Sequence, residues 1–307
     1  MFKKIAVGYA RDQAGRDAAV LADQLAKLGE SELEVVFPYH PLFATESPLE
    51  IERSVRTELH KLLGNSAALA RAHFRSSSSS WPIHALHELA EEENAETIVV
   101  GATPSASERH HVSRLERLVH SAPCTVALAP ASFSSHPFEL RAIGVGFADT
   151  PEGRAALILA REIAECAGAT VRVLAATGFS RELPSYVAPS PQLPLAETKM
   201  QRELHEVARH VTTELLAGVD YEVEVCRGDP CELLVRESET LDMLVLGSRA
   251  YGPLRRVLLG SVSLGSVSLG SVSASVMRAS RCPVIVAPRG ARVEATDNAR
   301  RSAAAQA

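Results

Sequence analysis

One pattern occurs twice in this chain, and this repetition limits the fold more than any other feature. The first copy reads KKIAVGYARDQAGRDAAVLADQLA at 3–26, and the second reads RAIGVGFADTPEGRAALILAREIA at 141–164, without a gap. Later pairs are AETIVVGATP at 95–104 with LDMLVLGSRA at 241–250, and SAPCTVALAP at 121–130 with SRCPVIVAPR at 280–289. Similar sequences with the same apolar pattern bury similar faces. We therefore expect two similar domains, 1–130 and 140–290, a polar linker at 131–139 and a disordered tail at 291–307.

Each copy alternates short β-branched runs with longer amphipathic stretches, which is typical of βαβ units and a buried parallel sheet. Helices are predicted at 15–28 and 153–166, where apolar residues recur at three- and four-residue steps. The expected strands are 3–9, 32–38, 70–75, 96–101 and 124–129, then 141–147, 169–175, 219–226, 242–247 and 282–287. The predicted fold is α/β, with two tandem doubly wound domains, each a five-stranded parallel sheet flanked by helices. In such folds the ligand site lies outside the carboxyl ends of the strands.

Composition excludes several classes of function. The 307 residues carry a net charge of -5, which gives no electrostatic footprint for nucleic acid or anionic lipid. No apolar run reaches the roughly 18 residues of a membrane span, and the apolar part of MFKKIAVGYA is too short for a signal peptide. The cysteines are odd in number and scattered, which favours reduced thiols in a cytoplasmic protein. They are Cys124, Cys166, Cys226, Cys231 and Cys282.

Two stretches of the second copy carry a resemblance to a known family. LGSRAYGPLRRVLLGSVS at 246–263 and SASVMRASRCPVIVAP at 273–288 resemble the C-terminal half of universal stress protein domains. The first strands, ending in VGYA and VGFA, resemble the family's opening VGYDGS. The resemblance implies a non-catalytic cytoplasmic module of stress response or regulation. It also implies that ATP, where a member binds it, lies on a Gly-x2-Gly-x9-Gly-Ser/Thr loop, with an aspartate after the first strand near the adenosine.

The chain departs from this pattern at both ends of the implied ligand. Ala10 and Ala148 stand at the aspartate position, and a methyl group cannot accept a hydrogen bond. Asp149 comes one residue later, where a side chain points elsewhere. In domain one, Val112 and Ser113 fall where the loop needs Gly-Ser, and a β-branched side chain crowds the phosphate position. We expect no ATP site in domain one.

Domain two keeps more of the implied phosphate loop. Ala250 replaces its second glycine, which costs roughly 1 kcal/mol if that position needs a positive φ. We expect weak ATP binding in domain two alone, with no catalytic residue and no metal ligand; an ordinary strand-to-helix turn is the alternative. The candidate residues are Gly247, Arg249, Gly252, Gly260, Ser261, Gly270, Ser271 and Ser273.

The letters LGSVS occur three times within 258–276, so more than one Gly-Ser competes for the start of the last helix. The family spacing after Ala250 selects Gly260, whereas the spacing back from Cys282 selects Gly270. A five-residue repeat does not form one apolar stripe on a helix, and its glycines and serines disfavour helix. The third copy is therefore predicted at the helix start, and extension of the helix back to Ser261 is the competing outcome.

Two enzyme classes are weaker alternatives. GVGFAD at 144–149 has the Gly-x-Gly of a dinucleotide-binding oxidoreductase but places Asp149 where the third glycine belongs. A serine hydrolase would need a Gly-x-Ser-x-Gly elbow, which the sequence lacks.

The resemblance also implies pairing of domains, because family members commonly pair through the last strand. CTVALAP at 124–130 and CPVIVAP at 282–288 are thus candidates for pairing within the chain, and a homodimer of the whole chain is left open.

Overall fold

The computed structural model describes residues 1–39, 46–77, 82–102, 115, 118–119, 122–177, 193–248 and 271–288. The chain divides into two compact units. The first comprises Met1–Glu139 with Cys282–Ile285, and the second comprises Leu140–Arg281 with Val286–Ala307.

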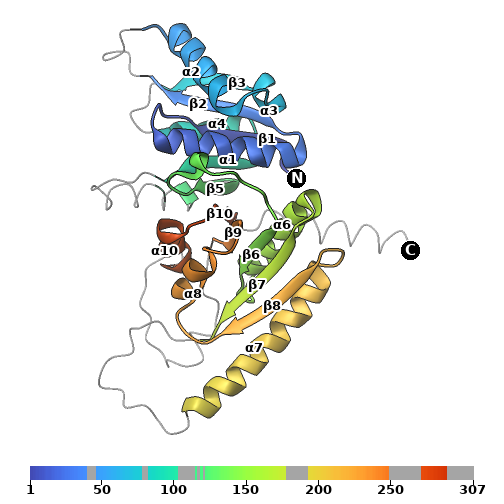
Figure 1. The fold of residues 1–307 in the computed structure, drawn as a ribbon. Helices are drawn as coiled ribbons and strands as arrows, with labels where there is room; N and C mark the ends of the chain where they lie inside the picture. Colours follow the sequence, from blue (N-terminus) through green and yellow to red (C-terminus); the bar gives the residue numbers. More distant parts are fainter. Residues whose placement is uncertain are drawn as a thin grey trace, which may run out of the picture. The chain divides into compact units, whose positions relative to one another are not determined.

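The first unit contains a parallel sheet with helices between its strands (Figure 1). Its strands follow the order β3-β2-β1-β4-β5, and every registered pair is parallel. The elements are β1 (Lys4–Gly8), α1 (Gln13–Gly29), β2 (Glu32–Pro38), α2 (Pro48–Leu63), α3 (Ala67–Ala70), β3 (His73–Ser77), α4 (Pro82–Glu92), β4 (Thr97–Gly101), β5 (Thr125–Ala129) and the 3-10 turn η1 (Phe133–Ser135).

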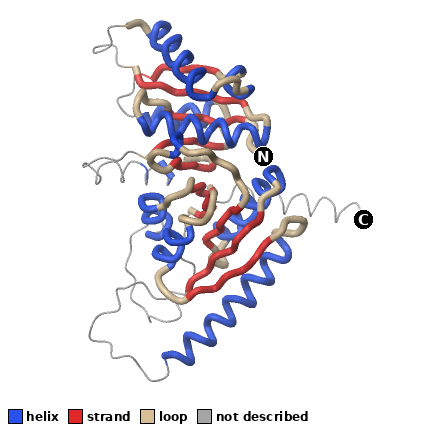
Figure 2. The backbone as a smooth tube through the Cα atoms, viewed as in Figure 1, coloured by secondary structure: helices blue, strands red, loops and turns tan. Residues whose placement is uncertain are grey.

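The second unit repeats this arrangement (Figure 2). Its strands follow the order β9-β6-β7-β8, with β10 beside β9, and the registered pairs of β6 with β7, β6 with β9 and β7 with β8 are parallel. The elements are β6 (Ala142–Gly146), α6 (Pro151–Ala167), β7 (Thr170–Ala176), α7 (Leu193–Leu215), β8 (Tyr221–Cys226), α8 (Pro230–Glu237), β9 (Met243–Gly247), α10 (Ser271–Ala279) and β10 (Val284–Ala287).

Helices cover both faces of the first sheet. A Cβ on Gly8 would lie 2.9 Å from Leu86 of α4, whereas a Cβ on Gly101 would lie 1.9 Å from the carbonyl oxygen of Ala14 in α1. The register places Gly101 on the same face as Val7, and successive residues of a strand alternate between faces. α1 and α4 therefore pack on opposite faces. The predicted doubly wound α/β class is confirmed, while a count of five strands for each domain stays a prediction because the division of the chain passes through β10.

The strand predicted at 70–75 was wrong at its start, because β3 covers His73–Ser77. The preceding residues form α3, a short helix that the apolar pattern did not predict. Ser66 caps this helix by accepting a hydrogen bond from the Leu69 amide, and its hydroxyl also contacts the buried carboxylate of Asp23. A capping serine with a buried acidic partner thus keeps 67–70 helical and delays the strand.

Candidate functional site

In both units the first strand and the following helix approach each other very closely. A Cβ on Gly15 would lie 1.8 Å from the carbonyl oxygen of Ala10, and one on Gly153 would lie 1.9 Å from that of Ala148. Only glycine permits this approach, because no larger residue has room. The helix starts are capped by Asp12 in α1 and Thr150 in α6. In each unit, the alanine therefore lies next to the N-terminus of the following helix, beyond the first strand, where a ligand of this fold lies.

Asp149 does not replace the missing aspartate. Its carboxylate accepts hydrogen bonds from Arg154, at 3.0 Å from Nε and 2.9 Å from the terminal nitrogen. Both side chains are partly exposed; Asp149 precedes α6, and Arg154 lies in the first turn of that helix. The Asp149 carboxylate thus faces Arg154. This agrees with the expectation that a side chain one residue after the aspartate position points elsewhere.

The end of β9 is tied to the start of α10. Gly247 is the last residue of β9, and a Cβ there would lie 2.7 Å from the carbonyl oxygen of Glu152 in the first turn of α6. The hydroxyl of Ser273 is completely buried and donates a 3.0 Å hydrogen bond to the carbonyl oxygen of Gly247. Ser273 belongs to the third LGSVS copy, so this copy supplies the first described residues of α10, Ser271–Ser273.

Ser248 follows β9 directly and places a buried hydroxyl at the same edge. Its side chain is 3% exposed, and among the described residues its Oγ has no hydrogen-bond partner. A buried hydroxyl without a partner carries an unfavourable free energy of about 1–3 kcal/mol, which a water or a bound molecule that hydrogen-bonds to it would relieve. The matched residue of the first unit is Ala102, whose amide donates to the carbonyl oxygen of Ala129 at 2.9 Å.

The structure brings together two of the predicted site residues, Gly247 and Ser273, and adds Ser248 to them. Ser271 is the first described residue of α10, and the structure does not describe its side chain. Five candidates lie outside the described residues: Arg249, Gly252, Gly260, Ser261 and Gly270. The predictions at Val112 and Ser113 also fall outside them. These residues remain sequence predictions.

The first unit places a hydrogen-bonded cluster after β1. Tyr9 is 2% exposed, and its hydroxyl donates to Glu58 of α2 at 3.1 Å. Arg11 donates from Nε to the other oxygen of Glu58 at 2.9 Å and also contacts Ser54. Burial and the Glu58 charge raise the pKa of Tyr9 to about 12, and the hydrogen bond from Arg11 lowers the pKa of Glu58. Tyr9 and Arg11 therefore fasten α2 to the residues that follow β1.

Sequence reasoning missed this cluster, although a signal was present. Tyr9 matches Phe147 in the second copy, so the two copies differ there by one hydroxyl in an otherwise similar apolar position. A tyrosine that is buried needs a hydrogen-bond partner, whereas phenylalanine does not. The tyrosine at this matched position thus indicates a hydrogen bond in the first domain that Phe147 cannot make in the second.

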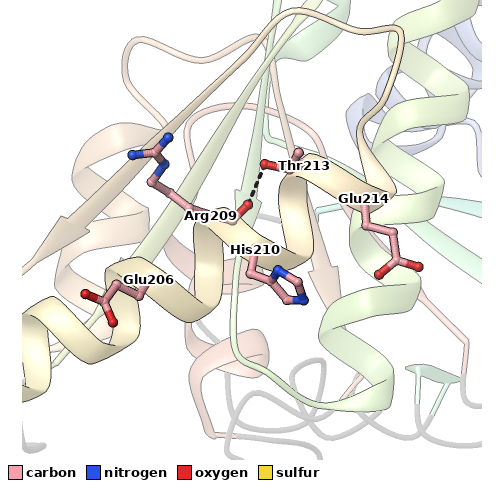
Figure 3. Close-up of a pocket in the computed structure, with 5 residues that line it drawn as sticks. All are labelled: Glu206, Arg209, His210, Thr213 and Glu214. Atoms are coloured by element: carbon pink, nitrogen blue, oxygen red, sulfur yellow. Dashed lines mark hydrogen bonds between the residues drawn. The ribbon is translucent and has the colours of Figure 1, made fainter.

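A shallow hollow of about 520 Å³ lies on the surface of α7 (Figure 3). Its lining residues are Glu206, Arg209, His210, Thr213 and Glu214. Thr213 lies 3.0 Å from the hydroxyl of Tyr221, the first residue of β8, so the hollow is near the amino ends of the strands. It is not part of the site at the carboxyl ends.

None of the helices in the described ranges is both long and apolar enough to cross a membrane. Within the same ranges, His, Cys, Asp and Glu side chains form no group of three or more that could hold a metal ion.

Known proteins resemble the chain over nearly its whole length. The model of the universal stress protein family matches residues 1–130 and 139–265. Universal stress proteins of Mycobacterium bovis and Mycobacterium tuberculosis are each 24% identical over 300 residues, covering 92% of this chain and 99% of the relative.

Solved structures show the same fold. A protein of unknown function from Pseudomonas aeruginosa has a TM-score of 0.66 at 18% identity, covering 94% of this chain and 92% of its own. A universal stress protein from Archaeoglobus fulgidus has a TM-score of 0.59 at 17% identity, covering 94% and 97%. With both copies of the repeat matched by the family model, the chain belongs to the universal stress protein family.

Proposed function

We propose that this chain is a non-catalytic module of stress response or regulation that binds ATP weakly, and only in its second domain. The observation that carries the proposal is the buried, unpartnered hydroxyl of Ser248 at the carboxyl end of β9. Next to it, Ser273 ties the third LGSVS copy to Gly247. This connection brings the start of α10 to the strand end from which the family's phosphate loop departs, and helix starts favour anions.

The first domain lacks the corresponding features. Ala102 stands where the second domain has Ser248, so no hydroxyl is available there. After β1, the Tyr9 hydroxyl is already bonded to Glu58, and Arg11 directs its charge to the same carboxylate. A nucleotide in the first domain would have to compete with these contacts. The family membership also favours a binding module over the oxidoreductase and hydrolase alternatives.

Two matched substitutions test the proposal on the whole chain. Ala148→Asp restores a carboxylate beyond β6, and Ala10→Asp makes the same change beyond β1. We expect Ala148→Asp to tighten ATP binding about tenfold, because a hydrogen bond to a charged group contributes about 1.5–3 kcal/mol. Ala10→Asp should leave the ATP dissociation constant unchanged.

Isothermal titration calorimetry of the parent chain and both variants measures this difference. Ser248→Ala in the Ala148→Asp background should then weaken binding, because the ligand loses the hydroxyl. Equal ATP affinity in the Ala10→Asp and Ala148→Asp proteins would contradict the assignment to the second domain. Undetectable binding in every variant would mean that the second domain is a scaffold without a nucleotide site.

Two further features belong to the same proposal. The cysteines are free, at Cys124, Cys166, Cys226, Cys231 and Cys282, which favours a reducing, cytoplasmic compartment. We also infer that the two domains pair within the chain, as the family resemblance implies, and that any homodimer adds to this pairing. Fractionation of cells and light scattering of the purified chain would test these two points.

A further inference from the structure

A buried acidic side chain lies at the centre of an ion-pair network in the first unit. Glu34 of β2 is 1% exposed, and its Oε1 lies 2.9 Å from Nδ1 of His73 and 3.8 Å from Nζ of Lys4. Its Oε2 lies 4.0 Å from Nε of Arg75 and has no hydrogen-bond partner among the described residues. Glu93, just after α4, pairs with both Lys4 and Arg75. The outer strand β3 thus presents basic side chains to an acidic centre.

The second unit has a network of the opposite sign. Arg172 of β7 lies 2.9 Å from Glu222 and 3.1 Å from Glu224, both on β8. It also lies 3.1 Å from Glu237 at the end of α8. These acids raise the pKa of Arg172, although burial acts against them. The outer strand β8 thus presents acidic side chains to a basic centre.

The two centres occupy equivalent places. Glu34 stands opposite Ala6 in the first sheet, and Arg172 stands opposite Gly144 in the second, while Ala6 and Gly144 are matched in the repeat. In the outer strands, His73 stands opposite Glu34 and Glu222 stands opposite Arg172. The partners on the outer strands are therefore basic in the first copy and acidic in the second, around a common backbone pattern, whereas Lys4 of β1 is matched by the uncharged Ala142.

A chain with two similar sheets can pair its strands in more than one way. β8 could join β2 in place of β3, and β3 could join β7 in place of β8. The backbone hydrogen bonds of a parallel pair are the same in each case, so they do not distinguish the two outer strands. The first exchange would place Glu222 opposite Glu34, and the second would place His73 and Arg75 beside Arg172. Like charges on facing strands are destabilising. We infer that these inverted networks select the correct outer strand for each sheet, within one chain and between copies of it.

A double variant tests the inference without altering the net charge. Glu34→Arg with Arg172→Glu exchanges the two centres, so that β2 now matches the acidic strand β8 and β7 matches the basic strand β3. After unfolding in urea and refolding, we expect the ratio of exchanged to correct pairing to rise about tenfold relative to the parent, as several cross-strand pairs change sign together. Exchanged strand pairing is counted in this ratio whether it occurs within one chain or between two chains.

Cross-linking of thiols reports the pairing directly. Cys226 of β8 stands opposite Ala176 of β7, and Pro38 occupies the place in β2 that matches Ala176. Neighbouring strands lie about 4.8 Å apart, within reach of a short bismaleimide. With Ala176→Cys and Pro38→Cys both present, correct pairing links Cys226 to position 176, and exchanged pairing links it to position 38. Mass spectrometry of the cross-linked peptides gives the ratio, and light scattering shows whether exchange joins two chains.

Two controls keep the test decisive. Exchanging the exposed pair Arg161 and Glu165 alters charges of the same kind on α6 and should leave the ratio unchanged. A variant with every member of both networks inverted should return to the parent's ratio, even if the double variant aggregates. The inverted residues are Lys4, Glu34, His73, Arg75, Glu92, Glu93, Arg172, Glu222, Glu224, Arg236 and Glu237. An unchanged ratio in a folded double variant, or failure of the full inversion to restore it, would overturn the inference.

Discussion

Asp17 holds the segment after β5 against α1, and its removal should release that segment. The side chain is fully buried, and its Oδ2 accepts a 2.8 Å hydrogen bond from the amide of Ser132. Its Oδ1 accepts from the amide and hydroxyl of Ser134, at 2.8 and 2.7 Å, and from Gln13 at 2.8 Å. The segment predicted as a linker, 131–139, thus begins with the η1 turn fixed to the first unit. The second copy has Ala155 at the matched position.

The magnitude of the loss follows from these contacts. Hydrogen bonds to a charged group contribute about 1.5–3 kcal/mol each, and Asp17→Ala removes all of those at this carboxylate. Ser132 is exposed and Ser134 half-buried, so water can replace part of the lost bonding. Removing the carboxylate also removes its own desolvation penalty. We expect a net loss of about 2–4 kcal/mol in the free energy of opening this turn.

Amide hydrogen exchange measures this opening free energy locally. Exchange at Ser132 and Ser134 should accelerate about 30- to 1000-fold in Asp17→Ala, which corresponds to the same 2–4 kcal/mol. Asp149→Ala is the control, because it removes an aspartate whose ion pair with Arg154 is partly exposed and contributes at most about 1 kcal/mol. If the turn exchanges at the parent's rate in Asp17→Ala, the carboxylate does not hold the segment and the reasoning is wrong.

Three further predictions concern alkaline pH, thiol reactivity and the repeated segment. The pKa of Tyr9 is raised to about 12, so the folded state holds this proton more tightly than the unfolded state; its stabilisation should be present below pH 10 and lost between pH 10 and 12. Tyr9→Phe should remove that part of the pH dependence in urea unfolding curves. The exposed Cys166 should be alkylated by iodoacetamide at pH 8 long before Cys124, because burial raises the Cys124 pKa to about 12; equal labelling by mass spectrometry would contradict this. Deleting Leu264–Ser273 moves the first Ser-Val-Ser to the start of α10 and should tighten ATP binding about 5- to 30-fold, because it restores the family spacing from Ala250 and shortens the segment between β9 and α10; unchanged affinity in calorimetry would show that repeat length does not limit binding.

The fold could be predicted from the repeat because its apolar pattern is local. Short apolar runs such as TIVVG and MLVLG are typical of buried strands in a parallel sheet, and the observed β4 and β9 lie within a residue of the predicted ranges. The start of β3 was missed because α3 depends on Ser66 meeting Asp23, which lies 43 residues away in sequence. A tertiary contact of this kind outweighs local propensity.

The site could be predicted only in part. Gly247 and Ser273 were both candidates from the family spacing, and the structure joins them by a hydrogen bond that the spacing alone did not predict. Ser248 was missed because a serine after a strand carries no signal until its burial is known. Glu34 and Arg172 were missed for a similar reason, because the charges that face them lie on strands far along the chain. Burial and long-range pairing decide the role of these polar residues.

Photolabelling with 8-azido-ATP tests the central claim most directly, because it reports which domain holds the nucleotide. The whole chain, in the Ala148→Asp form that should bind most tightly, is labelled, digested and mapped by mass spectrometry. The account predicts that labels competed by ATP fall only on peptides of the second domain, 140–290. ATP-protected labels on peptides of the first domain, 1–130, would contradict it.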